Sequence, residues 1–365
     1  AMRLALAAVP EDAANASTYV DDPIITAVGD ESTQNENFGI IVACLLAMGY
    51  ELSFAKAQDS RVEGRVTWTS GVLEWLPTEE AIKVEVKPEI LADLGENIES
   101  MFKANAVNVE DLRSLAGRAT CVASLVHVWR PFVGMLWGPI FDTRSRCPFS
   151  PEMIWRKAVE IPLLWMKAFL RGARGTLQRI YSLSSYLGEG DDVQIVADAS
   201  PIGIGAFLKI NGIIKEFPFG SSTALDEKIL QVRRGVSDGQ QVWESLVLLY
   251  ALRLWSKVWQ QRRCTLLVRS DSVSALVMVT KMKTAGVGTS IIAREMALDI
   301  GEALYTPNVA EHLPGIANVV ADHLSRMGDR VSSPLPAQLR GAKQRLFHER
   351  DHSWWRSLEL SAHCG

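Results

Sequence analysis

The sequence lacks a membrane-length apolar run and any cysteine spacing typical of a disulfide or zinc framework. Its five cysteines are odd in number and form no C-x-x-C pair: Cys44, Cys121, Cys147, Cys264 and Cys364. This pattern indicates a reducing compartment. The longest apolar stretch, near 38–48, is too short to span a bilayer and lacks a signal peptide's position and basic flank. We therefore expect an intracellular protein, cytoplasmic or nuclear, that is neither secreted nor placed in a membrane.

The chain also lacks an overall positive charge, since its formal net charge is −4. The charge is uneven, however: residues 1–77 hold 4 Lys/Arg against 11 Asp/Glu, whereas residues 112–181 hold 11 against 3. A dense basic segment can follow the phosphates of a duplex, and it can equally be a solvated charged face. Tryptophans are interleaved with this segment, and we expect most of them to lie in the core: Trp129, Trp137, Trp155 and Trp165.

Length and composition favour two or three globular domains, because 365 residues with 48% hydrophobic content can build sizeable cores. The C-terminal segment 328–365 contains His348-x-x-x-His352 and the pair His363-Cys364. A zinc module would need a second cysteine there, so the segment is interpreted as a polar tail.

Two predicted strands each end in an aspartate. Asp198 follows the apolar run 193–197, which is typical of a buried central strand, and 202–208 is expected to be its hairpin partner. Asp271 closes a further β pattern at 264–270, and Ser272 is expected to cap the next helix.

Two further carboxylates lie on predicted helices. Glu244 stands near the start of an amphipathic helix over 240–258. Asp322 follows a Pro-Gly turn and lies in a short helix that is expected to present it inward. Convergence of four carboxylates predicts a two-metal site for Mg²⁺ or Mn²⁺, because such ions prefer oxygen ligands and can clamp a phosphodiester.

The order strand-Asp, helix-Glu, strand-Asp, helix-Asp resembles the ribonuclease H domain of retroelement reverse transcriptases. The phrase P-G-x-x-N-V-V-A-D-x-L-S-R at 314–326 is similar to long-terminal-repeat (Gypsy-like) or tyrosine-recombinase (DIRS-like) retrotransposons. The resemblance implies an α/β fold, a ribonuclease H-like mixed five-strand sheet with flanking helices. It also implies that Asp198, Glu244, Asp271 and Asp322 hold two ions and hydrolyse the RNA strand of an RNA/DNA hybrid.

A second resemblance lies near the N-terminus. Tyr19-Val20-Asp21-Asp22 is similar to the hairpin of reverse-transcriptase palms, and 38–48, 49–56 and 66–72 resemble the palm helix, the lysine-bearing strand and the primer-grip hairpin that follow it. By this resemblance Asp21 holds metal and Asp22 supports it. Lys56 would lie near the leaving pyrophosphate, unless it is a solvated lysine after a strand.

The resemblance divides the chain into five parts: 1–77, the C-terminal half of a palm; 78–145, thumb helices; 146–190, a connection; 191–327, the ribonuclease H domain; and 328–365, a tail. Only eighteen residues precede Tyr19, so the upstream palm and fingers of the same polyprotein would be missing. We expect RNA-directed DNA polymerase activity to belong to the parent protein and to be lost here.

Residues that could contact a template-primer duplex or an RNA/DNA hybrid are spread over the chain: Arg113 and Arg118 on a helix capped by Asn108, Trp68 in the primer grip, and Ser200 and Gln241 near the acids. His312 resembles a loop histidine that assists product release, but its place on the strand side of Pro314-Gly315 favours a structural role. Two alternatives to the enzyme remain: a catalytically silent nucleic-acid-binding remnant, and another ribonuclease H-fold nuclease, which would lack Tyr19-Val20-Asp21-Asp22.

Overall fold

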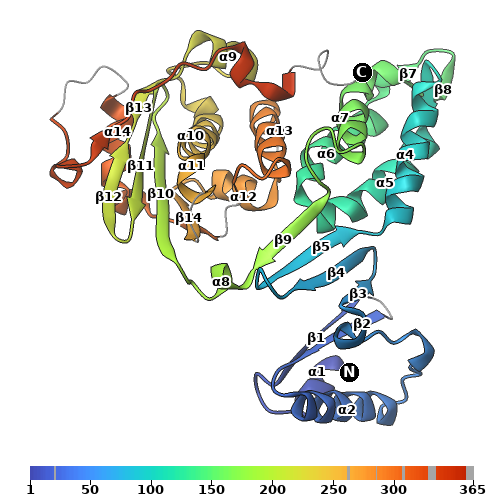
Figure 1. Ribbon diagram of the computed structural model, residues 1–365. Helices are drawn as coiled ribbons and strands as arrows, with labels where there is room; N and C mark the ends of the chain where they lie inside the picture. Colours follow the sequence, from blue (N-terminus) through green and yellow to red (C-terminus); the bar gives the residue numbers. More distant parts are fainter. Residues whose placement is uncertain (20–21, 261–263, 285, 306–308, 328–333, 359–365) are drawn as a thin grey trace.

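The computed structural model describes residues 1–19, 22–260, 264–284, 286–305, 309–327 and 334–358. It is a mixed α/β protein with four separate β-sheets. A small N-terminal part protrudes from a larger body in which a helical group and a large sheet lie next to each other (Figure 1). In the described ranges, no helix has both the length and the apolar character needed to cross a membrane.

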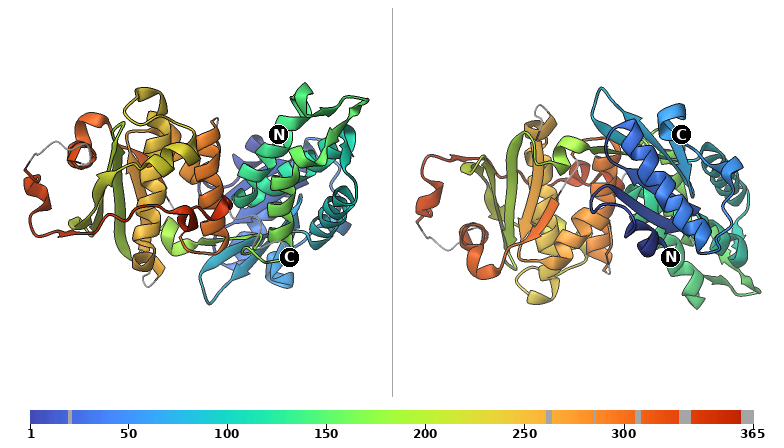
Figure 2. Two further views of the ribbon diagram at one scale, coloured as in Figure 1. Left: turned by 90° about the horizontal axis from the view of Figure 1, so that it is seen from above. Right: turned by 90° about the horizontal axis from the view of Figure 1, so that it is seen from below.

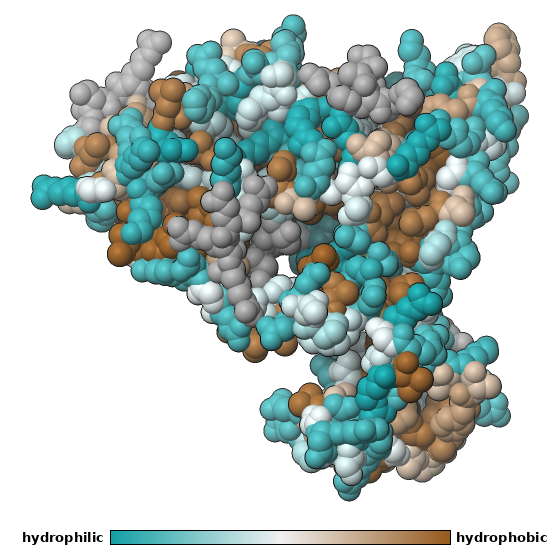
Figure 3. Space-filling view, viewed as in Figure 1, coloured by the Kyte–Doolittle hydropathy of each residue, from teal (hydrophilic) through white to brown (hydrophobic). Residues whose placement is uncertain are grey.

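The N-terminal part is a two-stranded sheet packed on two helices: α1 (Met2–Leu6), β1 (Ala14–Tyr19), β2 (Asp22–Ala27) and α2 (Glu31–Ala47). Its core is small, with Ala5, Val9, Ile41 and Leu45 as the buried apolar residues. Brown, hydrophobic atoms are visible on the surface of this lower part in Figure 3. Its exposed large side chains include Tyr19, Phe38, Leu46, Tyr50 and Phe54. Lys56 ends a 3-10 turn, Phe54–Lys56, so the expected lysine-bearing strand is absent from these residues.

A four-stranded antiparallel sheet follows, in the order β3 (Arg65–Trp68), β4 (Gly71–Leu76), β5 (Ala81–Val86) and β9 (Gln178–Ser182). The hairpin of β3 and β4 lies where the primer-grip resemblance was found. Its fourth strand, β9, comes from the segment interpreted as a connection and pairs with β5. Part of the segment interpreted as a connection is therefore a strand of this sheet.

The helical group contains α4 (Pro88–Phe102), α5 (Val109–Leu125), α6 (Arg130–Phe141) and α7 (Glu160–Leu170), with a small sheet of β6 (Ala106–Asn108), β7 (Arg146–Cys147) and β8 (Ser150–Trp155). Asn108 caps α5 as expected, because its side chain accepts a hydrogen bond from the Glu110 amide. Trp129 and Trp165 are fully buried, and Phe132 lies 6.0 Å from Trp165 between ring centroids. Trp155, in contrast, is 47% exposed.

The largest sheet runs β15 (Val309–His312), β14 (Cys264–Ser270), β10 (Asp191–Ala199), β11 (Gly203–Ile210), β12 (Ile213–Phe217) and β16 (Lys343–Gln344), with β13 (Phe219–Ser221) paired to β11. The sheet is mixed, since β10 is parallel to β14 and antiparallel to β11. The expected number of five strands was too low: seven are present, because β13 and β16 join the sheet. The short β16 comes from the C-terminal segment, which no local pattern assigns to a sheet.

Helices cover both faces of this sheet (Figure 2). One face carries α10 (Gln240–Leu254), α12 (Val273–Lys281) and α13 (Val287–Gly301), with α9 (Ala224–Leu230) and α11 (Ser256–Gln260) beside them, and the other carries α14 (Val319–Met327). The alternation of β10 explains this arrangement: Val193, Ile195 and Ala197 join the first core, whereas Val196 joins the core under α14. Asp198 is two residues beyond Val196 and shares its face.

The C-terminal segment was expected to be a polar tail, and its described part, 334–358, is instead packed against the large sheet and its helices. Arg350 is 1% exposed and makes a two-bond ion pair with Asp226, at 2.7 and 3.0 Å. Trp355 is fully buried in the main core. The interpretation was wrong because the partners of this segment are distant in the sequence, such as Asp226 at 124 positions from Arg350, and no local pattern shows them.

Helix α13 joins two cores. Its residues Ile291, Ile292 and Met296 pack with the large sheet. Ala297 and Leu298, at its C-terminal end, pack instead with the helical group of α4 to α7. The helical group and the large sheet thus share one helix, and the amide of Thr176 donates a hydrogen bond to the Gly301 carbonyl at the same junction.

Candidate metal centre

Three of the predicted carboxylates meet at one end of the large sheet. Oxygen atoms of Asp198, Glu244 and Asp271 all lie within 4.8 Å of one another. Because β10 and β14 are parallel neighbours, the C-terminal ends of both strands lie at the same end of the sheet. This brings Asp198 and Asp271 together. Ser272 caps α12 as expected, by accepting a hydrogen bond from the Ala275 amide, and so fixes the turn that follows Asp271.

Asp198 is held by residues of the α14 segment. The Ser325 hydroxyl donates to its Oδ2 at 2.7 Å, and the Asn318 amide donates to its Oδ1 at 3.3 Å. The approach of α14 depends on Gly205, which pairs with Asp198 across β10 and β11. A Cβ at Gly205 would lie 2.5 Å from the Leu324 Cβ and from the Ser325 amide nitrogen. Glycine is therefore required for α14 to pack this closely on the sheet.

Glu244 lies in the second turn of α10 and is 5% exposed. Its Oε1 accepts a hydrogen bond from the Gln240 side chain at 2.7 Å, and the same amide group also donates to the Ala199 carbonyl. The other carboxylate oxygen, Oε2, is buried without a hydrogen-bond partner among the described residues. Gln240 thus links the start of α10 to the end of β10 and orients Glu244.

Burial raises the pKa of both inner carboxyl groups. The pKa of Glu244 rises to about 9, first because of desolvation and then because of the neighbouring Asp198 charge. The pKa of Asp198 rises to about 7 by desolvation, a rise that the hydrogen bond from Ser325 reduces and the charges of Asp271 and Asp322 increase. Crowded carboxyl groups with raised pKa values are typical of sites that bind cations or protons.

Asp322 does not join this group, which corrects the expectation of four converging acids. Its side chain is 43% exposed and forms an ion pair with Arg326, one turn later in α14, at 2.8 Å. The physical reason is the i,i+4 spacing, which places the guanidinium beside the carboxylate on the outer face of the helix. Asp322 remains close enough to raise the pKa of Asp198 through its charge.

The residues expected to read nucleic acid near this site are placed as follows. Ser200 lies at the β10–β11 turn, where its Oγ accepts a hydrogen bond from the Gly203 amide at 2.8 Å. Gln241 is exposed on α10. The sequence interpretation overlooked its neighbour Gln240, although the i,i+4 spacing to Glu244 was a visible signal. His312 ends β15 and is exposed.

Of the two acids in the palm resemblance, Asp21 and Asp22, the structure describes Asp22. Asp21 lies outside the described residues, so its predicted metal role is not addressed by the structure. Asp22 begins β2 and is exposed, and its carbonyl accepts a hydrogen bond from the Trp68 indole at 2.9 Å. Trp68 therefore ties the β3–β4 hairpin to the segment that carries Asp22.

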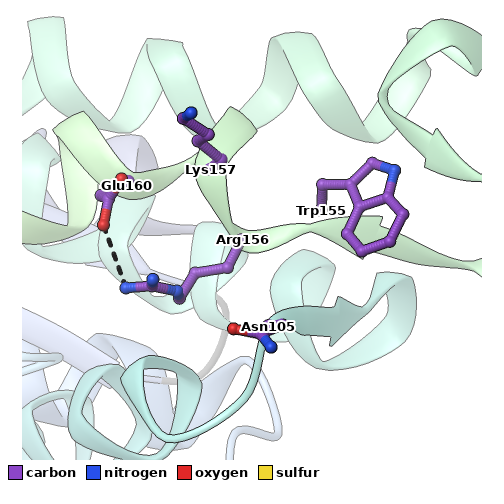
Figure 4. Close-up of a pocket in the computed structure, with 5 residues that line it drawn as sticks. All are labelled: Asn105, Trp155, Arg156, Lys157 and Glu160. Atoms are coloured by element: carbon purple, nitrogen blue, oxygen red, sulfur yellow. Dashed lines mark ion pairs between the residues drawn. The ribbon is translucent and has the colours of Figure 1, made fainter.

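The two arginines expected on the thumb differ in their surroundings. Arg113 is exposed on α5, whereas Arg118 forms an ion pair with Asp93. A surface pocket of about 600 Å³ also lies in this helical part, lined by Asn105, Trp155, Arg156, Lys157 and Glu160. In Figure 4 Arg156 reaches toward Glu160, with which it pairs at 3.0 Å, and Lys157 points away from Trp155. This pocket holds none of the three clustered carboxylates.

No protein-family model matches the chain, and no curated protein matches it. Among solved structures it is similar to the foamy viral protease-reverse transcriptase in complex with RNA/DNA hybrid, at 15% identity and a TM-score of 0.35, covering 83% of this chain and 36% of that one. A foamy viral protease-reverse transcriptase "dRH" in complex with ds DNA matches at 16% identity and a TM-score of 0.35, covering 82% and 46%. The chain spans less than half the length of either protein. Both structural overlaps are loose, as the TM-score of 0.35 shows.

Proposed function

We propose that the chain is a nuclease of the ribonuclease H type, which hydrolyses the RNA strand of RNA/DNA hybrids with divalent cations. The observation that carries this proposal is the meeting of Asp198, Glu244 and Asp271 within 4.8 Å at one sheet edge, with the first two almost fully buried. Buried carboxylates are costly unless a proton or a cation compensates them. A site of this kind is therefore suited to hold cations.

The residues present fit Mg²⁺ or Mn²⁺. Besides the carboxylates, three buried side-chain oxygens at the site have no hydrogen-bond donor among the described residues: Glu244 Oε2, Gln240 Oε1 and Asn318 Oδ1. The cluster contains neither cysteine nor histidine. A donor set made only of oxygen favours hard cations over zinc.

Two such ions, when bound, supply the Lewis acidity that activates a water and stabilises the leaving oxygen of a phosphodiester. Asp198, Glu244 and Asp271 would hold them. Asn318 and Ser325 orient Asp198, and Gln240 orients Glu244. Asp322, which is partly exposed, would be available as a further ligand if its ion pair with Arg326 opened.

Selection of the RNA strand would come from contacts to 2′-hydroxyl groups in the wide minor groove of the hybrid. Gln241 is exposed next to Gln240, and Ser200 lies at the end of β10. Both can therefore face a strand that approaches the carboxylates. These two side chains are our candidates for strand selection.

The proposal is tested with a hybrid whose RNA strand is labelled. The wild-type chain should cleave it in Mg²⁺ and leave a 3′-hydroxyl and a 5′-phosphate. Asp198→Asn should abolish cleavage and leave binding unchanged or tighter, because one ligand charge is lost without any change in the phosphate-binding surface. The matched control is Asp142→Asn, the same change at a surface pair with Arg144. Equal hydrolysis by wild type and Asp198→Asn would refute the assignment.

A second candidate function is binding without cleavage, which the Asp322–Arg326 pair favours because it leaves three acids at the centre. In that case the wild-type chain binds the hybrid and releases no product in Mg²⁺ or Mn²⁺. Arg326→Ala, which frees Asp322, would then be expected to restore cleavage if the pairing is the cause.

A further inference from the structure

Most cations of the basic middle segment are already neutralised. Each of the following pairs with a carboxylate within the described structure: Arg118 with Asp93, Arg144 with Asp142, Arg156 with Glu160, Lys167 and Arg171 with Glu99, and Arg174 with Glu302. A paired cation attracts a phosphate less strongly, because its charge is compensated. The excess of positive charge in the sequence therefore overstates the surface available for nucleic acid.

Two of the cations that form no such pair among the described residues, Arg130 and Arg179, lie close to each other. Within the same described ranges, the other unpaired cations of this segment are Arg113, Arg146 and Lys157. Arg179 of β9 contacts the Nε2 atom of His127, and its guanidinium lies 4.4 Å from the centre of the Tyr181 ring. Arg130, the first residue of α6, donates to the carbonyls of Ala123 and Lys281 at 2.9 and 2.8 Å. Neither guanidinium has a carboxylate within ion-pair distance among the residues that the structure describes.

The electrostatics of the pair are unfavourable in the protein alone. Both side chains are half-buried. Burial lowers the pKa of Arg130, and the nearby Arg179 charge lowers it further. The pKa of His127 falls to about 3 through burial and through both arginines, so the imidazole is neutral and accepts from Arg179. Positive charges that are removed from water without a counter-charge cost free energy, and an anion bound between them would offset that cost.

The pair lies at the junction of the helical group and the large sheet. The Arg130–Lys281 bond connects the start of α6 to the end of α12, and β9 passes between these two groups of helices (Figure 1). The start of α6 and strand β9 thus bring two arginines to one place, next to the end of α12.

We propose that Arg130 and Arg179 form a phosphate-binding site that takes a backbone phosphodiester of the nucleic acid bound to this chain. Guanidinium groups bind phosphate through charge-assisted, often two-point hydrogen bonds, and backbone phosphates fix the register of a strand on a protein. The identity of the ligand rests on the proposed nuclease function, whereas the presence of an anion site rests on the arginines alone. The site would position the hybrid relative to the carboxylates without taking part in hydrolysis.

The first experiment measures the anion site without nucleic acid. Inorganic phosphate, added to the full chain in EDTA at constant ionic strength, should raise the melting temperature of the wild type. Arg179→Gln should lose this response, Arg179→Lys should keep part of it, and Arg144→Gln, which removes an arginine that is 90% exposed, should keep all of it. An equal response in wild type and Arg179→Gln would overturn the site.

The second experiment measures hybrid binding in EDTA, where cleavage is absent. Arg179→Gln should weaken binding roughly 10-fold at low salt and lower the slope of log affinity against log salt by about 1 relative to Arg144→Gln. A phosphate response with unchanged hybrid binding would mean that the site takes free phosphate, which refutes the backbone assignment. If these variants behave as expected while the wild type never cleaves the hybrid, the nuclease function fails and the phosphate site stands.

Discussion

Replacing Glu244 by glutamine should stabilise the metal-free protein at neutral pH. Glutamine has the shape of the protonated acid, and its side-chain oxygen can still accept the hydrogen bond from Gln240. The pKa of Glu244 is about 9 in the folded chain against an ordinary value of 4.5. Between these two values the unfolded chain has released a proton that the folded chain still holds, so the free energy of unfolding falls as pH rises.

The size of the stabilisation at pH 7 follows from the roughly 2.5 pH units that separate pH 7 from the ordinary pKa of 4.5 in the unfolded chain. At 1.36 kcal/mol per pH unit, keeping Glu244 protonated at pH 7 costs about 3 kcal/mol. Glu244→Gln removes this loss, which for a chain of 365 residues corresponds to a rise in melting temperature on the order of 4 °C in EDTA. Near pH 4.5 the two proteins should be almost equally stable, because the carboxyl group is then protonated in the folded wild type and already half protonated in its unfolded state.

Thermal unfolding in EDTA, measured from pH 4.5 to pH 8, checks this prediction. The difference between the proteins should grow with pH, while the wild type should gain more stability from added Mg²⁺ than the variant, since an ion favours the ionised carboxylate. Some pH dependence should remain in Glu244→Gln, because the pKa of Asp198 is also raised, to about 7. A stability difference that is constant over this pH range would refute the reasoning.

Three further outcomes are expected. Arg350→Ala should lower the free energy of unfolding, measured by denaturant titration, by about 3–5 kcal/mol, because it leaves Asp226 buried without its partner. The control Arg345→Ala, at a partly exposed pair with Glu216, should lower it by about 1 kcal/mol or less. Gly205→Ala should cost about 1–3 kcal/mol and reduce Mg²⁺-dependent cleavage by displacing α14, and Gly117→Ala, where a Cβ meets nothing within 4 Å, should do neither. Asp322→Asn should retain more cleavage than Asp198→Asn in a single-turnover assay, and identical losses would show that Asp322 is a full member of the centre.

The centre was largely predictable because its acids follow from local patterns. Asp198 and Asp271 stand at the ends of two strands that are recognisable in the sequence, and the parallel pairing of these strands brings their ends together. Glu244 follows from the helical spacing of α10. The sequence did not predict which acids enter the centre. The i,i+4 spacing of Asp322 and Arg326 makes an ion pair possible, but whether it forms depends on the rotamers of both side chains.

The orienting residues were harder to predict. A step of one residue on a helix turns the side chain by about 100°, so Gln240 faces Glu244 while Gln241 is exposed. Asn318 and Ser325 contact Asp198 only because Gly205 admits α14, a condition set by packing between elements. The same reason hid the Arg350–Asp226 pair and the β5–β9 pairing, which join distant parts of the chain.

Helix α13 has a practical consequence for anyone who divides this protein into pieces. Residues 191–327 look like an autonomous unit in the sequence, yet Ala297 and Leu298 of α13 are buried among the helices of residues 88–170. A chain cut to 191–327 would expose that end of α13 to water, and a chain cut to 78–190 would lose part of its interior. Excised fragments should therefore aggregate more readily and unfold less cooperatively than the intact body. The smallest unit suitable for expression should extend from the sheet of β3, β4, β5 and β9 to residue 358.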